Sequence, residues 1–522
     1  MANIKEPNSK LINQGSYGCI YYPSLPFKLQ KKHSPHTTDE RKRYVSKLQK
    51  HNFHSEFEDY IGKKIQDIPS FDIFFVPVLS TYKIDLATIK QSYVTDCDAI
   101  SKYVRRNTHR ELNSKNSNLT PNDYQTLNKK FIMQKMKYIN GTNLRDHLLE
   151  VVTKRRRSYR KHDRDGSGSD KSDSDKSDSD SDNDNSDHDD MTNVSKTLRK
   201  DERQIRKYRS EFKQDETVSS YNLMSVAFDL YERIMDSIQL LIKFKIVHYD
   251  LKENNILVEK IQQLPYIIDF GLSIDIDRLL HNKWSDKTED NSKSSQSSKT
   301  VDSEVLYSPD SSKILKDNYL WKQHFYIHAP DYFLWPIEVH IMTYLINEHS
   351  TLTDESLRKI CYEYVANNRA IEYMSREFKK KMFEISVATF SRFINQPREK
   401  ALNELVKYWD KWDMYAINIM FLKIMYELIF HREVIATDAD PEPEAEAESI
   451  GEERQQKLDP HYSSDTKIEF KSKYKVKPKQ KYSSYKIMNT IQVMLRNIHP
   501  NPDKRMTPQE TKTFFVSIFY EC

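Results

Sequence analysis

The chain has 522 residues, of which 37% are hydrophobic and 30% are charged, and its formal net charge is +5 at pH 7. This length allows two to four domains, or one domain with inserts. No run approaches the ~18 consecutive apolar residues of a membrane span, and the first residues show no apolar signal region, which argues against a membrane-spanning or secreted protein.

The first segment with a clear pattern is LINQGSYGCIYY at residues 11–22, where apolar residues alternate around two glycines. The pattern predicts a hairpin whose tip, at Gly15 and Gly18, can approach a ligand closely. Residues 55–65, SEFEDYIGKKI, predict a helix. In that helix Glu58, Ile61 and Ile65 share one face, at positions i, i+3 and i+7.

Strand-like segments follow at residues 71–90, and the polar residues 96–128 predict a long excursion. An apolar strand from Phe131 then runs into a turn at Gly141 and a new helix. Residues 163–190 contain twelve Asp against three basic residues. Such composition cannot bury enough apolar area to offset chain entropy, so we expect disordered inserts near residues 154–215, 283–318 and 436–483.

The four cysteines are far apart and show no C-x-x-C spacing: Cys19, Cys97, Cys361 and Cys522. The spacing predicts neither a disulfide framework nor a zinc site. We therefore expect the protein to work in a reducing compartment, the cytosol or the nucleus.

The most informative stretch reads IVHYDLKENNILV at residues 246–258 and IIDFGL at residues 267–272. It places a carboxylate, an ammonium group and an amide on one short loop, at Asp250, Lys252 and Asn255. A second carboxylate, Asp269, follows after an apolar strand. Such a set can deliver a hydroxyl group to the terminal phosphate of a nucleotide, because phosphoryl transfer depends mostly on positioning and charge neutralisation.

These segments resemble the H-R-D-L-x-x-x-N and D-F-G signatures of protein kinases. The resemblance implies that Asp250 orients the incoming hydroxyl and accepts its proton, while Lys252 neutralises the transferring phosphoryl group. Asn255 and Asp269 would hold Mg²⁺, with Mn²⁺ as an alternative ion, because hard cations prefer oxygen ligands. In this family a lysine at position 252 marks the serine/threonine branch.

Earlier segments resemble the same family in the expected order. The hairpin is similar to the glycine-rich loop over the ATP phosphates, with Asn13 in place of the first glycine, and the implied ATP-binding residues are Asn13, Gly15, Ser16, Tyr17, Gly18 and Ile20. The segment YVSKL (44–48) is similar to the strand that carries the ATP-binding lysine, which would be Lys47 rather than Lys28, Lys31 or Lys32. Glu58 would be its partner, with Glu56 as the alternative.

Residues 131–139 resemble the kinase hinge. Met136 would guard the inner pocket, and the backbone of Lys137 and Ile139 would hydrogen-bond the adenine. Later, the activation segment should end at Asp331 or at Glu338; we prefer Glu338, because a glutamate reaches further toward a distant arginine.

That arginine would be Arg505, in the segment HPNPDKRMTP (499–508). Asp413, in WDMYAINIMFL (412–422), would bond the backbone of the catalytic loop, and Asn418 replaces the family's glycine there. Tyr249 replaces the arginine that normally pairs with a phosphorylated activation segment, so such phosphorylation should matter less in this protein.

The fold that the resemblance implies is α+β and bilobal, like that of protein kinases. A small β-sheet N-lobe would span residues 1–138, and a helical C-lobe with long polar inserts would span residues 139–522. The inserts and the phrases GSYGC, YVSK and WPIEVH resemble kinases of giant DNA viruses, mimivirus-like ones in particular.

The implied function is that of an ATP-dependent serine/threonine protein kinase. The set of Asp250, Lys252, Asn255 and Asp269 favours activity, whereas Asn13 and the inserts favour a pseudokinase that binds nucleotide or acts as a scaffold. A small-molecule phosphotransferase fits less well, because Asp413 and Arg505 are typical of protein kinases.

The implied partners are protein substrates, without a membrane. Nucleic acid is not required, although the basic run at 154–161 leaves that alternative open. The expected location is the cytoplasm or nucleus of an infected host cell, with packaging in a virion as an alternative.

Overall fold

The computed structural model describes residues 9–15, 18–25, 38–89, 91–108, 119–150, 217–285, 318–437 and 481–520. The predicted inserts lie almost wholly outside these residues, as do Ser16, Tyr17, the three early lysines and the basic run at 154–161. The chain divides into two compact units. The first comprises Met1–Val151, Ser225–Ile424 and Asn489–Cys522, and the second Val152–Met224 and Met425–Met488. The boundary predicted after residue 138 lies inside the first unit, which is described below.

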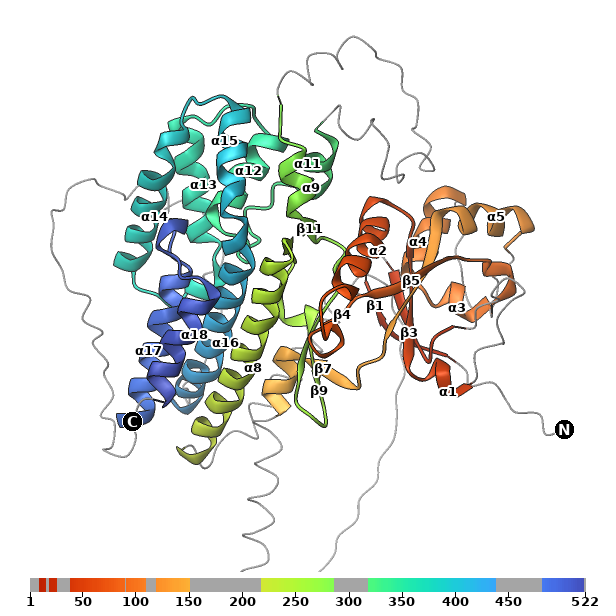
Figure 1. Ribbon diagram of the computed structural model, residues 1–522, viewed down its shortest axis with the longest axis horizontal. Helices are drawn as coiled ribbons and strands as arrows, with labels where there is room; N and C mark the ends of the chain where they lie inside the picture. Colours follow the sequence, from red (N-terminus) through yellow and green to blue (C-terminus); the bar gives the residue numbers. More distant parts are fainter. Residues whose placement is uncertain are drawn as a thin grey trace, which may run out of the picture. The chain divides into compact units, whose positions relative to one another are not determined.

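The fold is α+β, with small sheets formed by strands within residues 10–143 and 246–275 and with helices in the other described parts of the chain (Figure 1). The strands are β1 (Lys10–Gln14), β2 (Gly18–Tyr22), β3 (Tyr44–Lys50), β4 (Phe75–Val76), β5 (Val78–Lys83), β6 (Phe131–Lys137), β7 (Gly141–Asn143), β8 (Ile246–Val247), β9 (Ile256–Glu259), β10 (Pro265–Ile268) and β11 (Ile274–Asp275). The helices are α1 (Thr38–Arg41), α2 (Phe53–Gln66), α3 (Gln91–Thr95), α4 (Asp98–Thr108), α5 (Pro121–Lys130), α8 (Thr217–Lys243), α9 (Ile276–His281), α11 (Tyr319–His324), α12 (Ile337–Asn347), α13 (Asp354–Ala366), α14 (Arg376–Phe390), α15 (Arg398–Leu405), α16 (Trp412–Thr437), α17 (Lys481–Asn497) and α18 (Pro508–Tyr520). Short 3₁₀ turns are η1 (Phe71–Ile73), η2 (Leu86–Thr88), η3 (Glu253–Asn255), η5 (Arg369–Ile371), η6 (Ser391–Phe393), η7 (Val406–Lys411) and η10 (Pro502–Lys504).

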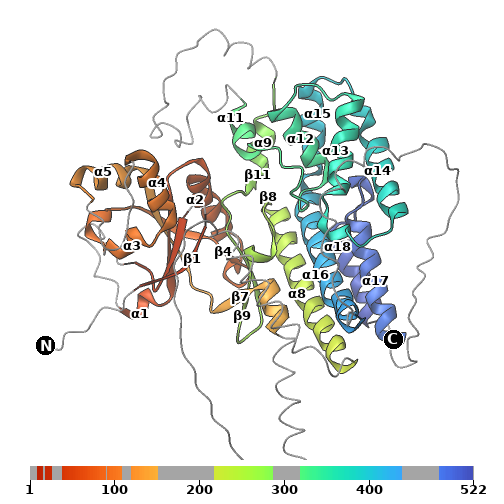
Figure 2. The ribbon, with the colours of Figure 1, turned by 180° about the vertical axis from the view of Figure 1, so that it is seen from behind.

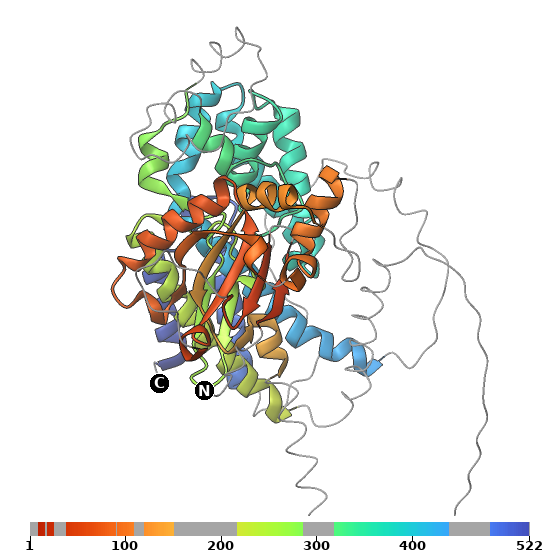
Figure 3. The ribbon, with the colours of Figure 1, turned by 90° about the vertical axis from the view of Figure 1, so that its right-hand side faces the viewer.

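The largest sheet has five strands in the order β1-β2-β3-β6-β5, and its strands are seen side by side in Figure 3. All of its neighbouring strands pair antiparallel, which places Lys47 opposite Ile20 on β2 and opposite Gln134 on β6. The other two sheets are four-stranded, in the order β4-β10-β9-β7, and two-stranded, β11-β8. Asp250 lies between β8 and β9 in the sequence, and Asp269 lies between β10 and β11.

Helix α2 begins at a capping box and packs against β5. The side chain of Asn52 accepts a hydrogen bond of 3.0 Å from the Ser55 amide, and Ser55 Oγ accepts one of 3.0 Å from the Asn52 amide, so two free donors at the helix start are satisfied. Its buried face includes Glu58, Ile61 and Ile65, as their spacing in the sequence predicts. The cap and the apolar face together fix which way Glu58 points.

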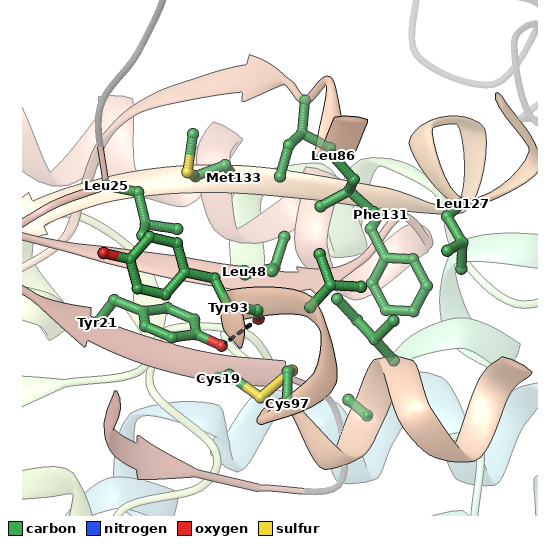
Figure 4. Packing of buried hydrophobic residues seen from close by; sticks show 14 of the residues in the cluster. Cys19, Tyr21, Leu25, Leu48, Leu86, Tyr93, Cys97, Leu127, Phe131 and Met133 are labelled. Carbon is green, nitrogen blue, oxygen red and sulfur yellow. Dashed lines mark hydrogen bonds between the residues drawn. A yellow bond between two sulfur atoms is a disulfide. The ribbon is translucent and has the colours of Figure 1, made fainter. Parts of the chain in front are cut away.

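Cys19 on β2 and Cys97, just before α4, form a disulfide bond in the core of the sheet region (Figure 4). Tyr21 packs beside them and donates a hydrogen bond of 2.6 Å to the carbonyl oxygen of Tyr93. The prediction of no disulfide was therefore wrong, because a separation of 78 residues hides a proximity that folding creates. The argument from thiols for a reducing compartment falls with it.

The polar excursion expected at residues 96–128 is also more ordered than its composition suggests, since its described part includes α4 and α5. Apolar residues of both helices, among them Ile100, Val104 and Leu127, are buried against Phe131 in the same core cluster. A few apolar residues at helical spacing are enough to fix such helices on a core.

Helices α8, α16, α17 and α18 lie side by side in both Figure 1 and Figure 2. Tyr231 on α8 joins three of them: its ring contacts Phe421 and Phe515, and its hydroxyl donates a hydrogen bond of 2.7 Å to Asn418 Oδ1. Asn418 thus acts as a polar link inside an apolar bundle. Among the described residues, no helix is both long and apolar enough to span a membrane.

Candidate active site

A cavity of about 310 Å³ lies where the five-stranded sheet and α2 meet the loops after β8 and β10. Its lining brings together residues that are far apart in the sequence, including Asn13, Gly15, Gly18, Ile20, Lys47, Glu58, Asp250, Lys252, Asn255 and Asp269. These are ten of the residues that the sequence analysis assigned to nucleotide binding or catalysis.

Lys47 stands at the centre of an ion cluster in this cavity. Its Nζ lies 2.9 Å from Glu58 Oε1, 3.0 Å from Glu58 Oε2 and 2.9 Å from Asp269 Oδ1. Burial acts to lower the pKa of Lys47, but the charges of Asp269 and Glu58 outweigh it and hold the pKa above its ordinary value. The lysine therefore stays charged at neutral pH.

The two carboxylates differ in their surroundings. Glu58 is buried, and burial raises its pKa against the opposing charge of Lys47. Asp269 has a side chain that is 46% exposed, and the charge of Lys47 lowers its pKa. Asp269 is thus an ionised carboxylate that a ligand can reach. Glu56, the alternative partner of Lys47, instead bonds His51, with 2.5 Å between Glu56 Oε1 and His51 Nε2.

Two buried glutamines support Glu58, and the sequence analysis did not find them. Gln49 Nε2 donates to Glu58 Oε2 at 2.8 Å and to Gln134 Oε1 at 2.5 Å. Gln134 Nε2 then donates to the backbone oxygen of Ser55 on α2 at 2.8 Å. This chain of amides connects β3 and β6 to both the backbone and the carboxylate of α2. A signal was present for Gln134, because a glutamine at the centre of the largely apolar segment FIMQKMK needs a buried partner.

Asp250 is held by its own loop. Its Oδ2 accepts a hydrogen bond of 2.6 Å from Lys252 Nζ and one of 3.0 Å from Asn255 Nδ2. Asn255 Nδ2 also donates to the Asp250 backbone oxygen at 2.8 Å, so the amide oxygen is the atom that Asn255 can offer to a cation. The other carboxylate oxygen of Asp250, Oδ1, accepts a hydrogen bond from the hydroxyl of Tyr332.

Asp413, on α16, fixes the backbone of the loop that carries Asp250. Its carboxylate accepts hydrogen bonds from the backbone amides of His248, at 2.6 Å, and Tyr249, at 3.0 Å. Asp413 thus bonds the backbone of the loop that carries Asp250. Two residues beside the candidate catalytic groups, Tyr249 (φ 68°) and Asp269 (φ 63°), adopt the left-handed conformation that non-glycine residues seldom use. Such strain is maintained where the surroundings dictate the backbone, often at functional sites.

The ring of Tyr249 sits in an aromatic cluster. It stacks on Trp335 with centroids 4.8 Å apart, and its edges meet Phe325 and Trp412. Trp335 Nε1 also donates a hydrogen bond of 2.9 Å to the Tyr249 backbone oxygen. Aromatic packing thus connects the loop that carries Asp250 to the segment before α12.

Of the two predicted ends of the activation segment, Glu338 is the one that meets Arg505. Arg505 Nη1 lies 2.6 Å from Glu338 Oε1, Nη2 lies 3.0 Å from Oε2, and both side chains are fully buried. Asp331 is exposed. The geometry is the bidentate pairing of a guanidinium group with a carboxylate.

The three residues expected to form a hinge, Met136, Lys137 and Ile139, do not line this cavity. Met136, at the end of β6, and Ile139 are buried in an apolar cluster with Val45, and Ile20 packs against it. Ile20 also lines the cavity, so the apolar cluster adjoins it. The Lys137 side chain turns away to the Asp72 backbone oxygen, 3.0 Å from its Nζ.

At the hairpin, Gly18 is required by packing, because a Cβ atom there would lie 2.4 Å from the Leu48 carbonyl oxygen. The expectation that both glycines serve the approach of a ligand is thus incomplete, since Gly18 lets β2 approach β3. Gly15 has nothing within 4 Å of its Cβ position, so a ligand could approach there.

The described residues contain no cluster of three or more His, Cys, Asp or Glu side chains suited to a metal. Asn255 and the half-exposed Asp269 can together offer two oxygen ligands. This number fits Mg²⁺, which is commonly held by one or two protein oxygens together with substrate phosphates and waters.

In comparisons with known proteins, no protein-family model and no curated protein matches this chain.

Proposed function

We propose that this protein is an ATP-dependent serine/threonine protein kinase with a bilobal kinase-like fold. The observation that carries the proposal is that Lys47, paired with Glu58 and Asp269, lines the same cavity as Asp250, Lys252 and Asn255. Phosphoryl transfer needs a cation for the nucleotide phosphates, oxygen ligands for a metal, and a carboxylate beside a lysine. The cavity offers all of these groups.

Each group has a role that its surroundings support. Lys47, held charged by two carboxylates, would bind the inner phosphates of ATP. Asn255 and Asp269 would hold Mg²⁺, which neutralises charge on the phosphates when bound. Asp250 would orient the acceptor hydroxyl and take its proton, and Lys252, 2.6 Å from Asp250 Oδ2, would stabilise the charge that develops on the transferred group.

The adenine would bind beside the ion cluster, where Ile20 connects the cavity to the apolar cluster of Val45, Met136 and Ile139. Apolar side chains suit the faces of a purine, and the backbone of residues 137–139 would supply its hydrogen bonds. The acceptor would be a serine or threonine of a protein, consistent with a lysine at position 252. The short segments GSYGC, YVSK and WPIEVH resemble segments of giant-virus kinases, which supports a viral origin within this proposal.

The deciding experiment is transfer of labelled phosphate from ATP with Mg²⁺ to histone, a basic protein, and to casein, an acidic one. Wild type is compared with Asp250→Asn and with Asp269→Ala. We expect Asp250→Asn to abolish label on Ser and Thr while ATP still raises the melting temperature. Asp269→Ala should weaken the magnesium-dependent part of nucleotide binding. Equal transfer by wild type and Asp250→Asn would exclude this mechanism.

The second candidate is a nucleotide-binding pseudokinase, which the exposed Asn13 in place of the first glycine of the loop favours. It predicts that ATP raises the melting temperature of wild type although no protein is labelled. Absence of both label and nucleotide binding would leave a scaffolding role.

A further inference from the structure

The two oxygens of the Asp250 carboxylate have different partners. Lys252 and Asn255 both donate to Oδ2, from within the same loop. Oδ1 is therefore the oxygen directed away from that loop, and it accepts the hydroxyl of Tyr332, which lies 82 residues further along the chain. An acceptor hydroxyl that is to give up its proton needs this same oxygen.

Tyr332 is held firmly in this position. Its backbone amide donates a hydrogen bond of 3.0 Å to the backbone oxygen of Ala329. Its backbone carbonyl oxygen accepts one of 3.1 Å from the Trp335 amide. Its ring meets the edge of Trp335 with centroids 4.9 Å apart. Trp335 in turn is bonded to the backbone of Tyr249, the residue next to Asp250. The hydroxyl is thus aimed at Asp250 by packed aromatic rings.

The phenol is a donor under ordinary conditions. Burial, and secondly the charge of Asp250, raise the pKa of Tyr332 well above its usual value. The hydroxyl consequently keeps its proton at neutral pH and donates it to Oδ1. A carboxylate oxygen that already accepts a phenolic hydrogen bond is less available to a second hydroxyl, because the phenol occupies the place from which that hydroxyl would donate.

We propose that Tyr332 is an acceptor-site residue whose hydroxyl competes with the substrate hydroxyl for Asp250 Oδ1. The inference rests on the proposed function and adds how the acceptor is admitted. A protein substrate that binds well displaces the Tyr332 hydroxyl, and its own hydroxyl then hydrogen-bonds Asp250 Oδ1. Water, which has no binding energy of its own to displace the phenol, reaches the base rarely, so wasteful hydrolysis of ATP is suppressed.

The test removes only the hydroxyl, in Tyr332→Phe, and uses Tyr362→Phe on α13 as the matched control, because Tyr362 is 49% exposed. Transfer to histone from labelled ATP and Mg²⁺, and ATP hydrolysis without histone, are both measured. A hydrogen bond to a charged group is worth about 1.5 kcal/mol or more, so Tyr332→Phe should raise kcat/KM for histone and the hydrolysis rate roughly tenfold. The KM for ATP should stay unchanged, and Tyr362→Phe should behave as wild type.

Three results would overturn the inference. A lower kcat in Tyr332→Phe would mean that the phenol positions Asp250 and does not compete with the acceptor. Equal rates in Tyr332→Phe and wild type would mean that the hydroxyl does not hinder the acceptor. Phosphotyrosine at position 332, found by mass spectrometry of wild type after incubation with Mg²⁺ and ATP, would make Tyr332 an acceptor itself.

A melting-temperature shift with ATP separates failure of this inference from failure of the proposed function. If neither wild type nor Tyr332→Phe transfers phosphate but both bind ATP, removing the hydroxyl has released nothing and the competition is refuted. If neither binds ATP, the kinase assignment fails and this inference fails with it.

Discussion

Gln49 donates a hydrogen bond of 2.8 Å to Glu58, on the side of the carboxylate that also faces Lys47. The bond crosses from β3 to α2 in a region where both side chains are buried. Glu58 is thus held by a neutral donor as well as by a charged one. Moving α2 away from the sheet would break the hydrogen bonds that Gln49 donates to Glu58 and that Gln134 donates to the Ser55 backbone oxygen, which is costly in a buried region.

Gln49→Leu should therefore raise the KM for ATP. The substitution keeps the side chain's volume but removes a buried hydrogen bond worth about 1 kcal/mol or more, so we expect an increase of roughly five- to tenfold with a smaller change in kcat. Steady-state kinetics at varied ATP measures it. The control is Gln66→Leu, which removes another amide that joins α2 to the Val78 oxygen without touching Glu58. An equal rise in that control would mean that any loosening of α2 has the same effect.

Activity should not require phosphorylation of the activation segment. Under the proposed function Tyr249 stands in place of a charged arginine, and its ring stacks on Trp335, so packing would do what a phosphate–arginine pair does in other kinases. We expect phosphatase treatment to leave the rate of phosphate transfer within about twofold of its initial value. Loss of activity that returns on re-phosphorylation would refute the prediction.

The ion pair of Glu338 and Arg505 should be essential for stability. Both side chains are fully buried, so Glu338→Gln leaves a guanidinium charge without its partner. Removing one member of such a pair costs about 3–5 kcal/mol of the free energy of unfolding. Urea denaturation measures it, with Glu384→Gln as the control. Glu384 and Lys380 form a pair at 3.9 Å with both side chains more than half exposed, for which the change should stay below ~1 kcal/mol. Equal effects of the two substitutions would show that burial does not matter here.

Stability should fall in mild acid because of His324. Its ring is buried against Phe53 and Phe57 of α2, and burial lowers its pKa to about 3. The unfolded chain binds this proton near the ordinary pKa of about 6.5, so the contribution of His324 is complete above that pH and is lost as pH falls toward 3.

The prediction is tested by melting temperatures of wild type and His324→Phe between pH 7.5 and pH 5, a range chosen around the reference pKa. Wild type should lose more stability than the variant as pH falls. Parallel curves would show that other groups account for the acid sensitivity.

Local patterns in the sequence were enough to find most of the candidate site. Glu58 could be chosen because α2 is a regular helix whose period places it on the face of Ile61 and Ile65. Lys47 and Glu58 are only 11 residues apart and belong to adjacent elements, so a strand followed by a helix already implies their meeting. The loops that carry Asp250 and Asp269 were recognisable from their own residues.

Contacts between distant segments could be decided only by the tertiary structure. Gln49 meets Gln134 across 85 residues, Tyr332 meets Asp250 across 82, and Cys19 meets Cys97 across 78. Periodicity tells which face of an element is buried, but not which distant side chain faces it. Each of these pairings depends on strand order and loop paths, and those follow from the packing of the whole core rather than from any local pattern.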